Sequence, residues 1–240
     1  LLLKITLFLL CLTAFSLLPH EESHAQGYQP MRIVTTPTAG SLPAGSYRLE
    51  THLFDGGGVT QRVLVGVTGH VDIGISYSGA NIIGSRKLDW APHAGAQIQI
   101  RIIEETFGSP GIAAGFDSQG DGPYFEGGGL NRFRTKSRGA YLVVSRNYRF
   151  LGDLGLHGGV NYSFEDDDGD KDPSFWGGLD KSITEMFELC AEYDFATNDN
   201  ENKDMTANRG WLNVALKLHL SDSFTLEADI QNILRNAKRD

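Results

Sequence analysis

The sequence predicts an all-β fold, a transmembrane antiparallel up-and-down β-barrel of about 12 strands, and three observations support this prediction. Apolar and polar side chains alternate with a period of two along most of the chain after residue 45. The alternating segments are about 9 to 13 residues long, enough to cross a bilayer, whereas strands of soluble proteins usually have about 5 or 6. Short turns and long polar loops alternate between the segments, which is the layout of outer-membrane barrels.

The first 25 residues predict a secretory signal peptide. Lys4 precedes an apolar run over 5–18, and residues 23–25 (Ser-His-Ala) form a small-x-small cleavage signal. The run is too short for a membrane-spanning helix, which needs roughly 20 apolar residues. We therefore expect Sec-type export, cleavage near Ala25 and a location in the outer membrane of a Gram-negative-type bacterium.

Composition limits the functional classes. The chain of 240 residues has a formal charge of −9, and it shows no basic patch, which argues against nucleic acid as a partner. Signal cleavage would leave Cys190 as the single thiol, so an internal disulfide is excluded and stability has to come from packing or from the membrane. No motif predicts a cofactor, and the sequence does not indicate an oligomeric state.

Eleven strands are predicted in chain order. Each of the first four strands has an apolar face and a polar face, and the apolar faces contain Leu49, Val65, Ile73 and Ile98 in turn. The apolar faces of later strands contain Leu156, Leu189, Leu216 and Leu226, while glycine blurs the alternation in the fifth, sixth and eighth strands. The expected strands are 46–55, 59–67, 70–78, 95–106, 110–118, 137–148, 153–165, 174–183, 186–196, 208–220 and 223–232.

The connections predict a meander with all tight turns at one end. Tight turns are expected at 68–69, 108–109, 151–152, 184–185 and 221–222, and the longer polar connections include 79–94, 119–136, 166–173 and 197–207. This pattern divides the exported chain into a periplasmic lead-in segment, 26–44, and the barrel, 45–240. Because bacterial barrels have an even number of strands, we expect a twelfth strand to be missing from the C-terminal end.

Aromatic residues lie at or near the ends of the predicted strands. Rings in these positions could form the two interfacial girdles of a membrane barrel, with outer-membrane lipid as the partner. They are Tyr47, Tyr77, Phe107, Tyr148, Phe150, Phe164, Phe175, Phe187, Phe195, Trp211 and Phe224.

Several stretches resemble an uncharacterised family of bacterial outer-membrane β-barrel proteins, distantly like barrels associated with exopolysaccharide export. The resemblance covers most of the chain after the signal peptide, and it implies location and architecture but no catalytic residues. The function that we expect for such a barrel includes the passage or export of polar solutes or of polysaccharide. The stretches that carry it are 37–58, 72–85, 115–124, 136–148, 155–163 and 170–183.

An acidic loop over 165–172 admits two interpretations. Four aspartates, Asp166, Asp168, Asp170 and Asp172, are spaced two apart around a glycine, and hard cations bind several carboxylate oxygens. The loop does not fit the EF-hand template, because with Gly169 in the sixth position Phe164 would stand first. The alternative is a solvated loop tip between two strands.

A set of polar residues is predicted to line the lumen. Such a set could form a pore that sorts solutes by size and charge, or the charges of both signs could satisfy one another in a plugged lumen. The residues are Arg48, Glu50, His52, Arg62, Asp72, Gln97, Arg101, His157, Asn161, Glu188, Glu192, Asp194, Asn213, Lys217 and Glu227.

Two other functional classes remain as alternatives. An outer-membrane hydrolase would need a Ser-His pair on neighbouring strands, and His157 and Ser163 do not qualify, because six residues of strand separate them by roughly 20 Å. A soluble secreted β-sheet binding protein would show the same alternation, with the apolar face as its core. The favoured interpretation is non-catalytic: a porin-like or envelope-structural barrel.

The facing of one strand gives a first testable prediction. Leu156→Arg would place a charge toward lipid near mid-strand and is expected to lower the free energy of unfolding by about 2 to 4 kcal/mol. Changes at the neighbouring His157, on the lumen side, are expected to barely affect folding. Denaturant titration of both variants in micelles measures this, and equal tolerance at the two positions would contradict the assigned facing.

Overall fold

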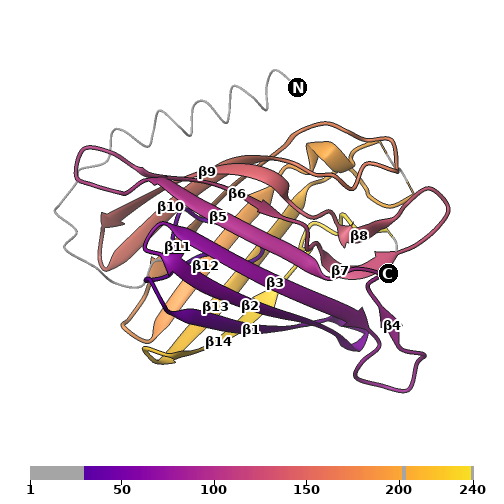
Figure 1. The fold of residues 1–240 in the computed structure, drawn as a ribbon, viewed down its shortest axis with the longest axis horizontal. Helices are drawn as coiled ribbons and strands as arrows, with labels where there is room; N and C mark the ends of the chain where they lie inside the picture. The colour runs from indigo at the N-terminus through magenta and orange to yellow at the C-terminus, as the bar shows by residue number, and fades with distance from the viewer. Residues whose placement is uncertain (1–29, 202–203, 239–240) are drawn as a thin grey trace.

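The computed structural model of the protein describes residues 30–201 and 204–238 and is built almost entirely of β-strands (Figure 1). Each of the eleven predicted strands is present, including the three in which glycine blurs the alternation. They are β1 (Tyr47–Phe54), β2 (Gly58–Thr68), β3 (Val71–Ala80), β5 (Gly95–Ile103), β6 (Gly111–Asp117), β9 (Gly139–Arg149), β10 (Asp153–Tyr162), β11 (Ser174–Ser182), β12 (Phe187–Asp194), β13 (Trp211–Ser221) and β14 (Phe224–Ile230).

The long strands form one antiparallel sheet in the order β1-β2-β3-β5-β6-β9-β10-β11-β12-β13-β14. The short β4 (Asp89–Trp90) pairs with the end of β3 and completes a sheet of 12 strands. β4 was not predicted from the sequence, and neither was the hairpin of β7 (Asp121–Phe125) and β8 (Arg132–Thr135). Two single turns of 3-10 helix, η1 (Asp55–Gly57) and η2 (Thr197–Asp199), lie in connections.

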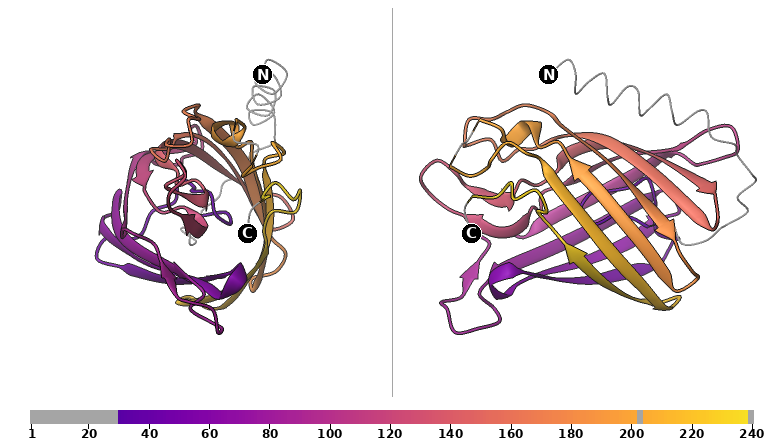
Figure 2. Two further views of the ribbon diagram at one scale, coloured as in Figure 1. Left: turned by 90° about the vertical axis from the view of Figure 1, so that its right-hand side faces the viewer. Right: turned by 180° about the vertical axis from the view of Figure 1, so that it is seen from behind.

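The sheet curls around an interior, as the left view of Figure 2 shows. Its edge strands, β1 and β14, approach one another through side chains: His52 Nε2 lies 3.6 Å from Asp229 Oδ2 and 3.3 Å from Gln231 Nε2. Among the described residues, no backbone ladder joins these two strands. The fold is therefore an antiparallel sheet of 12 strands that curls around an interior, with side-chain contacts between its two edge strands.

The two ends of the curled sheet differ. The connections at one end, the tight-turn end, are short and include the turn between Thr68 and Val71 and the turn between Ser221 and Phe224. The connections at the other end, the long-loop end, mostly span more than ten residues and contain β4, β7, β8 and η2. The predicted separation of tight turns from long loops is thus present.

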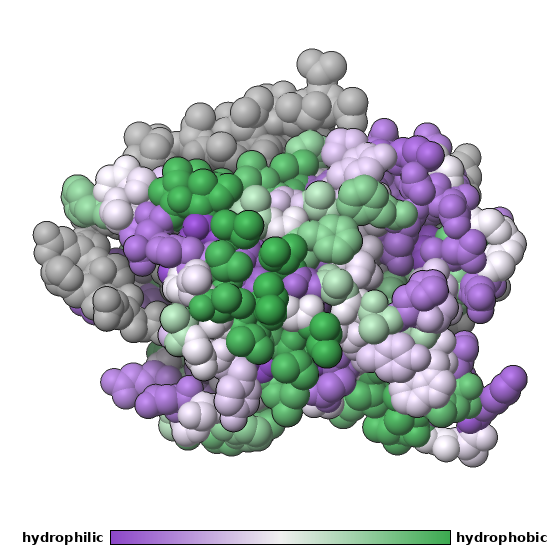
Figure 3. All heavy atoms as spheres, in the orientation of Figure 1, coloured by the Kyte–Doolittle hydropathy of each residue, from purple (hydrophilic) through white to green (hydrophobic). Residues whose placement is uncertain are grey.

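The two faces of the sheet have opposite polarity. Apolar side chains on the outer face are exposed, including Leu49 (65%), Ile75 (66%) and Ile230 (65%), whereas inner-face polar residues such as Asp72 are buried (1%). Figure 3 shows apolar residues crossing the middle of one side, with a group of polar residues at the upper right, at the long-loop end. Successive side chains of a strand point to opposite faces, so alternation in the sequence becomes a polar interior and an apolar exterior.

Most of the aromatic residues predicted for the girdles are exposed or half-buried, but two are not. Tyr148 and Trp211 are buried, at 4% and 5% exposure. Trp211 belongs to the inner face because it alternates in register with Asn213, which is also buried. The assignment of Trp211 to an outward-facing girdle was therefore wrong, whereas Tyr148 pairs in register with Leu154 and lies on the outer face.

The signal peptide predicted over 1–25 lies outside the described residues. Within the described part of the chain, no helix is long and apolar enough to cross a membrane.

Candidate functional site in the sheet interior

The interior holds a segment of the protein's own N-terminal region. Residues 31–42, here named the plug segment, run inward from the tight-turn end, turn at Ile33–Thr36 and return. Ile33 N donates to Thr36 O at 2.9 Å, and Thr38 N donates to Met31 O at 3.0 Å, so the segment closes as a small hairpin. The described part of the predicted lead-in, 30–44, thus lies largely inside the sheet.

A single carboxylate, Glu192 on β12, binds the tip of the plug segment. The backbone N–H groups of Val34, Thr35 and Thr36 donate to it at 3.0–3.1 Å, and the hydroxyls of both threonines donate at 2.6 Å. Asn213 Nδ2 on β13 adds a further bond at 2.9 Å. Hydrogen bonds to an ionised acceptor are stronger than those between neutral groups, so Glu192 is the main residue that binds the tip of the plug segment.

Packing and further hydrogen bonds hold the rest of the plug segment. Ile33 is fully buried and packs with Cys190 and Ala215; it fits there because a Cβ on Gly178 would lie 2.7 Å from its Cδ1. Polar groups of the sheet bind the plug backbone along its length: Gln99 donates to Gly40 O, Lys217 donates to Arg32 O, and Asp72 accepts from Leu42 N. The plug is therefore an integral part of the interior.

Fourteen of the fifteen residues predicted to line the lumen are buried or half-buried; the exception, Glu227 on the edge strand β14, is exposed. Several of their charges are paired within the interior or with the plug. Arg32 lies 2.5 Å from Asp117, Lys217 lies 3.5 Å from Glu188, and Arg138 pairs with Asp194. Arg62 lies 3.6 Å from Asp121, and Arg48 lies 3.3 Å from Glu50. These ion pairs and the bound plug segment together occupy much of the interior.

Three interior side chains from neighbouring strands form a hydrogen-bonded chain. Ser145 Oγ on β9 lies 2.8 Å from His157 Nδ1 on β10, and His157 Nε2 lies 3.3 Å from Asp180 Oδ1 on β11. All three residues are buried. Removal of His157 would leave Ser145 and Asp180, both buried, without this partner. The structure therefore favours a measurable loss of stability for changes at His157 over the near-neutral effect expected from the sequence.

The acidic loop at the long-loop end is tied down by basic residues from the β8 region. Asp168 lies 2.7 Å from Arg132 and 2.8 Å from Lys136, and its side chain is fully buried. Asp170 accepts from the backbone of Asn200 at 2.9 Å. The loop is therefore held by contacts of Asp168 and Asp170, while residues 167, 169, 171 and 172 are exposed.

The four aspartates proposed for a cation do not converge. Asp166 pairs with Lys171 at 3.1 Å, while Asp172 contributes its backbone N–H to Asp170. In residues 30–201 and 204–238, no group of three or more His, Cys, Asp or Glu side chains is arranged to hold a metal ion.

Arg132 joins the loops into a cap over the long-loop end. Its guanidinium is fully buried and binds both Asp168 and Asp199, which belongs to η2, with an Nη1–Oδ1 distance of 2.6 Å to Asp199. In the left view of Figure 2, the hairpin of β7 and β8 lies across the opening. The interior is thus filled from one end by the plug segment and covered at the other by the cap.

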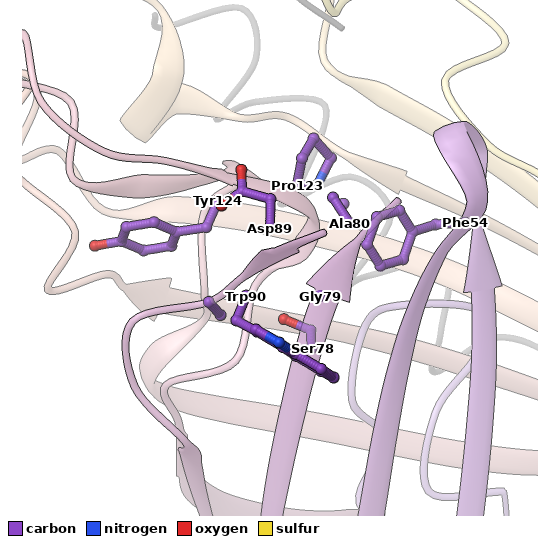
Figure 4. Close-up of a pocket in the computed structure, with 10 residues that line it drawn as sticks. Phe54, Ser78, Gly79, Ala80, Asp89, Trp90, Pro123 and Tyr124 are labelled. Carbon is purple, nitrogen blue, oxygen red and sulfur yellow. The ribbon is translucent and has the colours of Figure 1, made fainter. Parts of the chain in front are cut away.

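A shallow pocket lies at the long-loop end (Figure 4). Phe54, Trp90 and Tyr124 line it with Ser78 and backbone of β3 and β7. Asp89 is the only carboxylate of its lining, and the lining contains no histidine, cysteine or lysine. These residues offer no arrangement for nucleophilic, acid-base or metal chemistry.

The chain matches no protein-family model, no curated protein and no solved structure.

Glu165, at the base of the acidic loop, gives a prediction about pH. Burial raises the pKa of its carboxyl from 4.5 to about 7, although the N–H groups of Phe133 and Ser137 donate to it and oppose the shift. The folded protein therefore keeps a proton that the unfolded chain releases between about pH 4.5 and 7. The Glu165 contribution to the free energy of unfolding should fall as the pH rises through this window and stay constant above it.

Denaturant titrations between pH 5 and 8 measure this effect. Glu165→Gln, which cannot titrate, should show a smaller decrease in stability with rising pH than the wild type. The same pH dependence in both proteins would contradict the assignment.

Proposed function

We propose that the protein is an outer-membrane β-barrel whose interior is plugged by its own N-terminal segment. In this state it serves as an envelope-structural protein. Passage of polar solutes or of a polysaccharide, as in porin-like and export-associated barrels, requires the plug segment to move.

The observation that carries the proposal is the opposite polarity of the two faces. Exposed isoleucine, leucine and valine side chains cover the outer face of consecutive strands, while the buried residues of the interior are mostly polar. In water, such an apolar surface would be unfavourable, and soluble monomers rarely expose patches of this extent. Hydrocarbon chains cover it at no such cost. This argues against the soluble secreted binding protein.

Strand length and strand direction also support a barrel. The long strands have 7 to 11 residues, comparable with the 9 to 11 or so that a tilted transmembrane strand needs. A lipid environment offers no hydrogen-bond partner to free strand edges, so a membrane sheet has to close. β1 and β14 both run toward the long-loop end, so direct pairing of these two edges would be parallel. A barrel with antiparallel pairing throughout would need an odd number of further strands in the gap between β14 and β1.

Fractionation tests the membrane part of the proposal. The full chain, expressed with an export signal in a Gram-negative host, should appear in the outer-membrane fraction and migrate differently on SDS gels before and after heating. Recovery of folded protein in the aqueous fraction would contradict it.

The plug gives a separate prediction. Thr35→Val and Thr36→Val together keep the side-chain shape but remove the two hydroxyls that bind Glu192 at 2.6 Å. Each charge-assisted bond contributes about 1.5 to 3 kcal/mol, so the double variant should release the plug far more often. In planar bilayers the wild type should be mostly closed, and the variant should show frequent openings.

Thr51→Val is a matched control, because Thr51 is exposed and its hydroxyl binds Gln61 outside the plug. It should conduct like the wild type. A wild type that is permanently open, or a double variant as closed as the wild type, would contradict the plug as the element that closes the interior.

A further inference from the structure

We propose that Ser145, His157 and Asp180 form an ester-hydrolysing site that the plug segment masks. The proposal goes beyond the envelope role proposed above; it depends on movement of the plug and not on where the protein resides.

The strand register brings the three residues together. Ser145 on β9 stands directly opposite His157 on β10, and Asp180 on β11 stands opposite Gly155, two residues from His157 on the same face. In the sequence, Ser163 is the serine tested as the partner of His157, and pairings across strands stay open because no motif identifies one. The correct partner lies twelve residues away across a hairpin, and pairing in register is the signal that finds it.

Gly155 is the residue that lets the acid and the base meet. A Cβ at this position would lie 2.0 Å from Asp180 Oδ2 and 2.7 Å from His157 Nε2. The Asp180 carboxylate therefore occupies the space that any other residue at 155 would need. Gly155→Ala would push the carboxylate away from the imidazole.

The hydrogen bonds fix the direction of proton donation. An ionised Asp180 can only accept, so His157 Nε2 carries the proton and Nδ1 is the acceptor. Ala39 N donates to Ser145 Oγ at 2.8 Å, so the serine hydroxyl is free to donate to Nδ1. The result is a nucleophile, a base and an orienting carboxylate in the order that serine hydrolases use. The ring is reversed relative to the usual arrangement, but one nitrogen still accepts while the other donates.

The plug segment covers the nucleophile. Ala39 packs in one buried cluster with Ala113, Val143 and Trp176, and its backbone N–H donates a hydrogen bond to Ser145 Oγ. Trp176 is fully buried, and its Nε1–H has no hydrogen-bond acceptor within the described part of the chain. When Ala39 withdraws, Ser145 becomes accessible, and the unpaired indole N–H of the same cluster is a donor available to a bound carbonyl oxygen.

The surroundings indicate the substrate class. The three residues face the polar interior, whereas the apolar side chains of the same strands face outward, so a long acyl chain would find no matching surface beside Ser145. The small residues Ala39, Gly40 and Gly155 adjoin the site, and displacement of the first two frees space for a small group. A water-soluble carboxylic ester with a short acyl group fits these constraints.

The reaction balances without a cofactor. Ser145 Oγ attacks the ester carbonyl while its proton passes to His157 Nδ1, and the alkoxide leaves with that proton as the C–O bond breaks. Water then attacks the acyl-serine, giving its proton to His157, and the carboxylic acid departs as Ser145 regains a proton. Asp180 holds the imidazole in the tautomer that both steps need.

A serine-reactive fluorophosphonate tests the site in the purified full chain in detergent micelles. Ser145 Oγ would bond to phosphorus, fluoride would leave, and the serine proton would pass to His157. The Thr35→Val, Thr36→Val protein should label at least about tenfold faster than the wild type, because its plug opens more often. Adding Ser145→Ala should abolish the label, and adding His157→Gln should slow it by about 100-fold or more.

Further measurements separate catalysis from structure. Hydrolysis of p-nitrophenyl acetate by the plug-weakened protein should rise with pH through one ionisation, and Gly155→Ala should reduce it while the heat-dependent gel shift persists. Should the double variant not fold, Ala39→Pro, which removes the N–H on Ser145, carries the same comparisons. Labelling of the folded, plug-weakened protein that does not depend on Ser145 or on His157, or no labelling at all, overturns the proposal.

Discussion

The opposite polarity of the two faces is the constraint on which the structure depends. Alternation with a period of two sends nearly every charged side chain of the long strands to one side of a single curled sheet. A charge removed from water is costly unless it is paired and hydrogen-bonded. The interior therefore has to contain both signs of charge and a polar backbone to bind, and the plug segment supplies that backbone at Glu192, Gln99 and Asp72.

Glycine positions show how the interior makes room for what it holds. Gly178 leaves the space that Ile33 fills, and Gly155 leaves the space in which Asp180 reaches His157. In a strand that only had to present a face to water, either position could carry a side chain. Here the absence of a Cβ determines which groups touch. The binding of the plug segment and the contacts among Ser145, His157 and Asp180 therefore both depend on glycine in the strands.

Much of the fold could be predicted from the sequence, because strand periodicity and turn chemistry are local properties. The facing of Leu156 and His157 and the placing of Glu192 in the interior follow from alternation alone. The plug segment could not be predicted, because residues 31–42 show no period and their partners lie about 30 to 185 residues away. For the same reason Arg132 and Asp199 could not be paired in advance, and Trp211 was assigned to the wrong face from its position at a strand end.

The binding of the plug tip by Glu192 also constrains the order of folding. Thr35 and Glu192 are separated by 157 residues, so the tip of the plug can be secured only once β12 has joined the sheet. Until then, the plug segment can make only part of its contacts with the growing sheet. Contacts so distant in sequence form slowly. Docking of the tip of the plug segment is thus a late step in folding. It can be complete only after the sheet has curled around the plug.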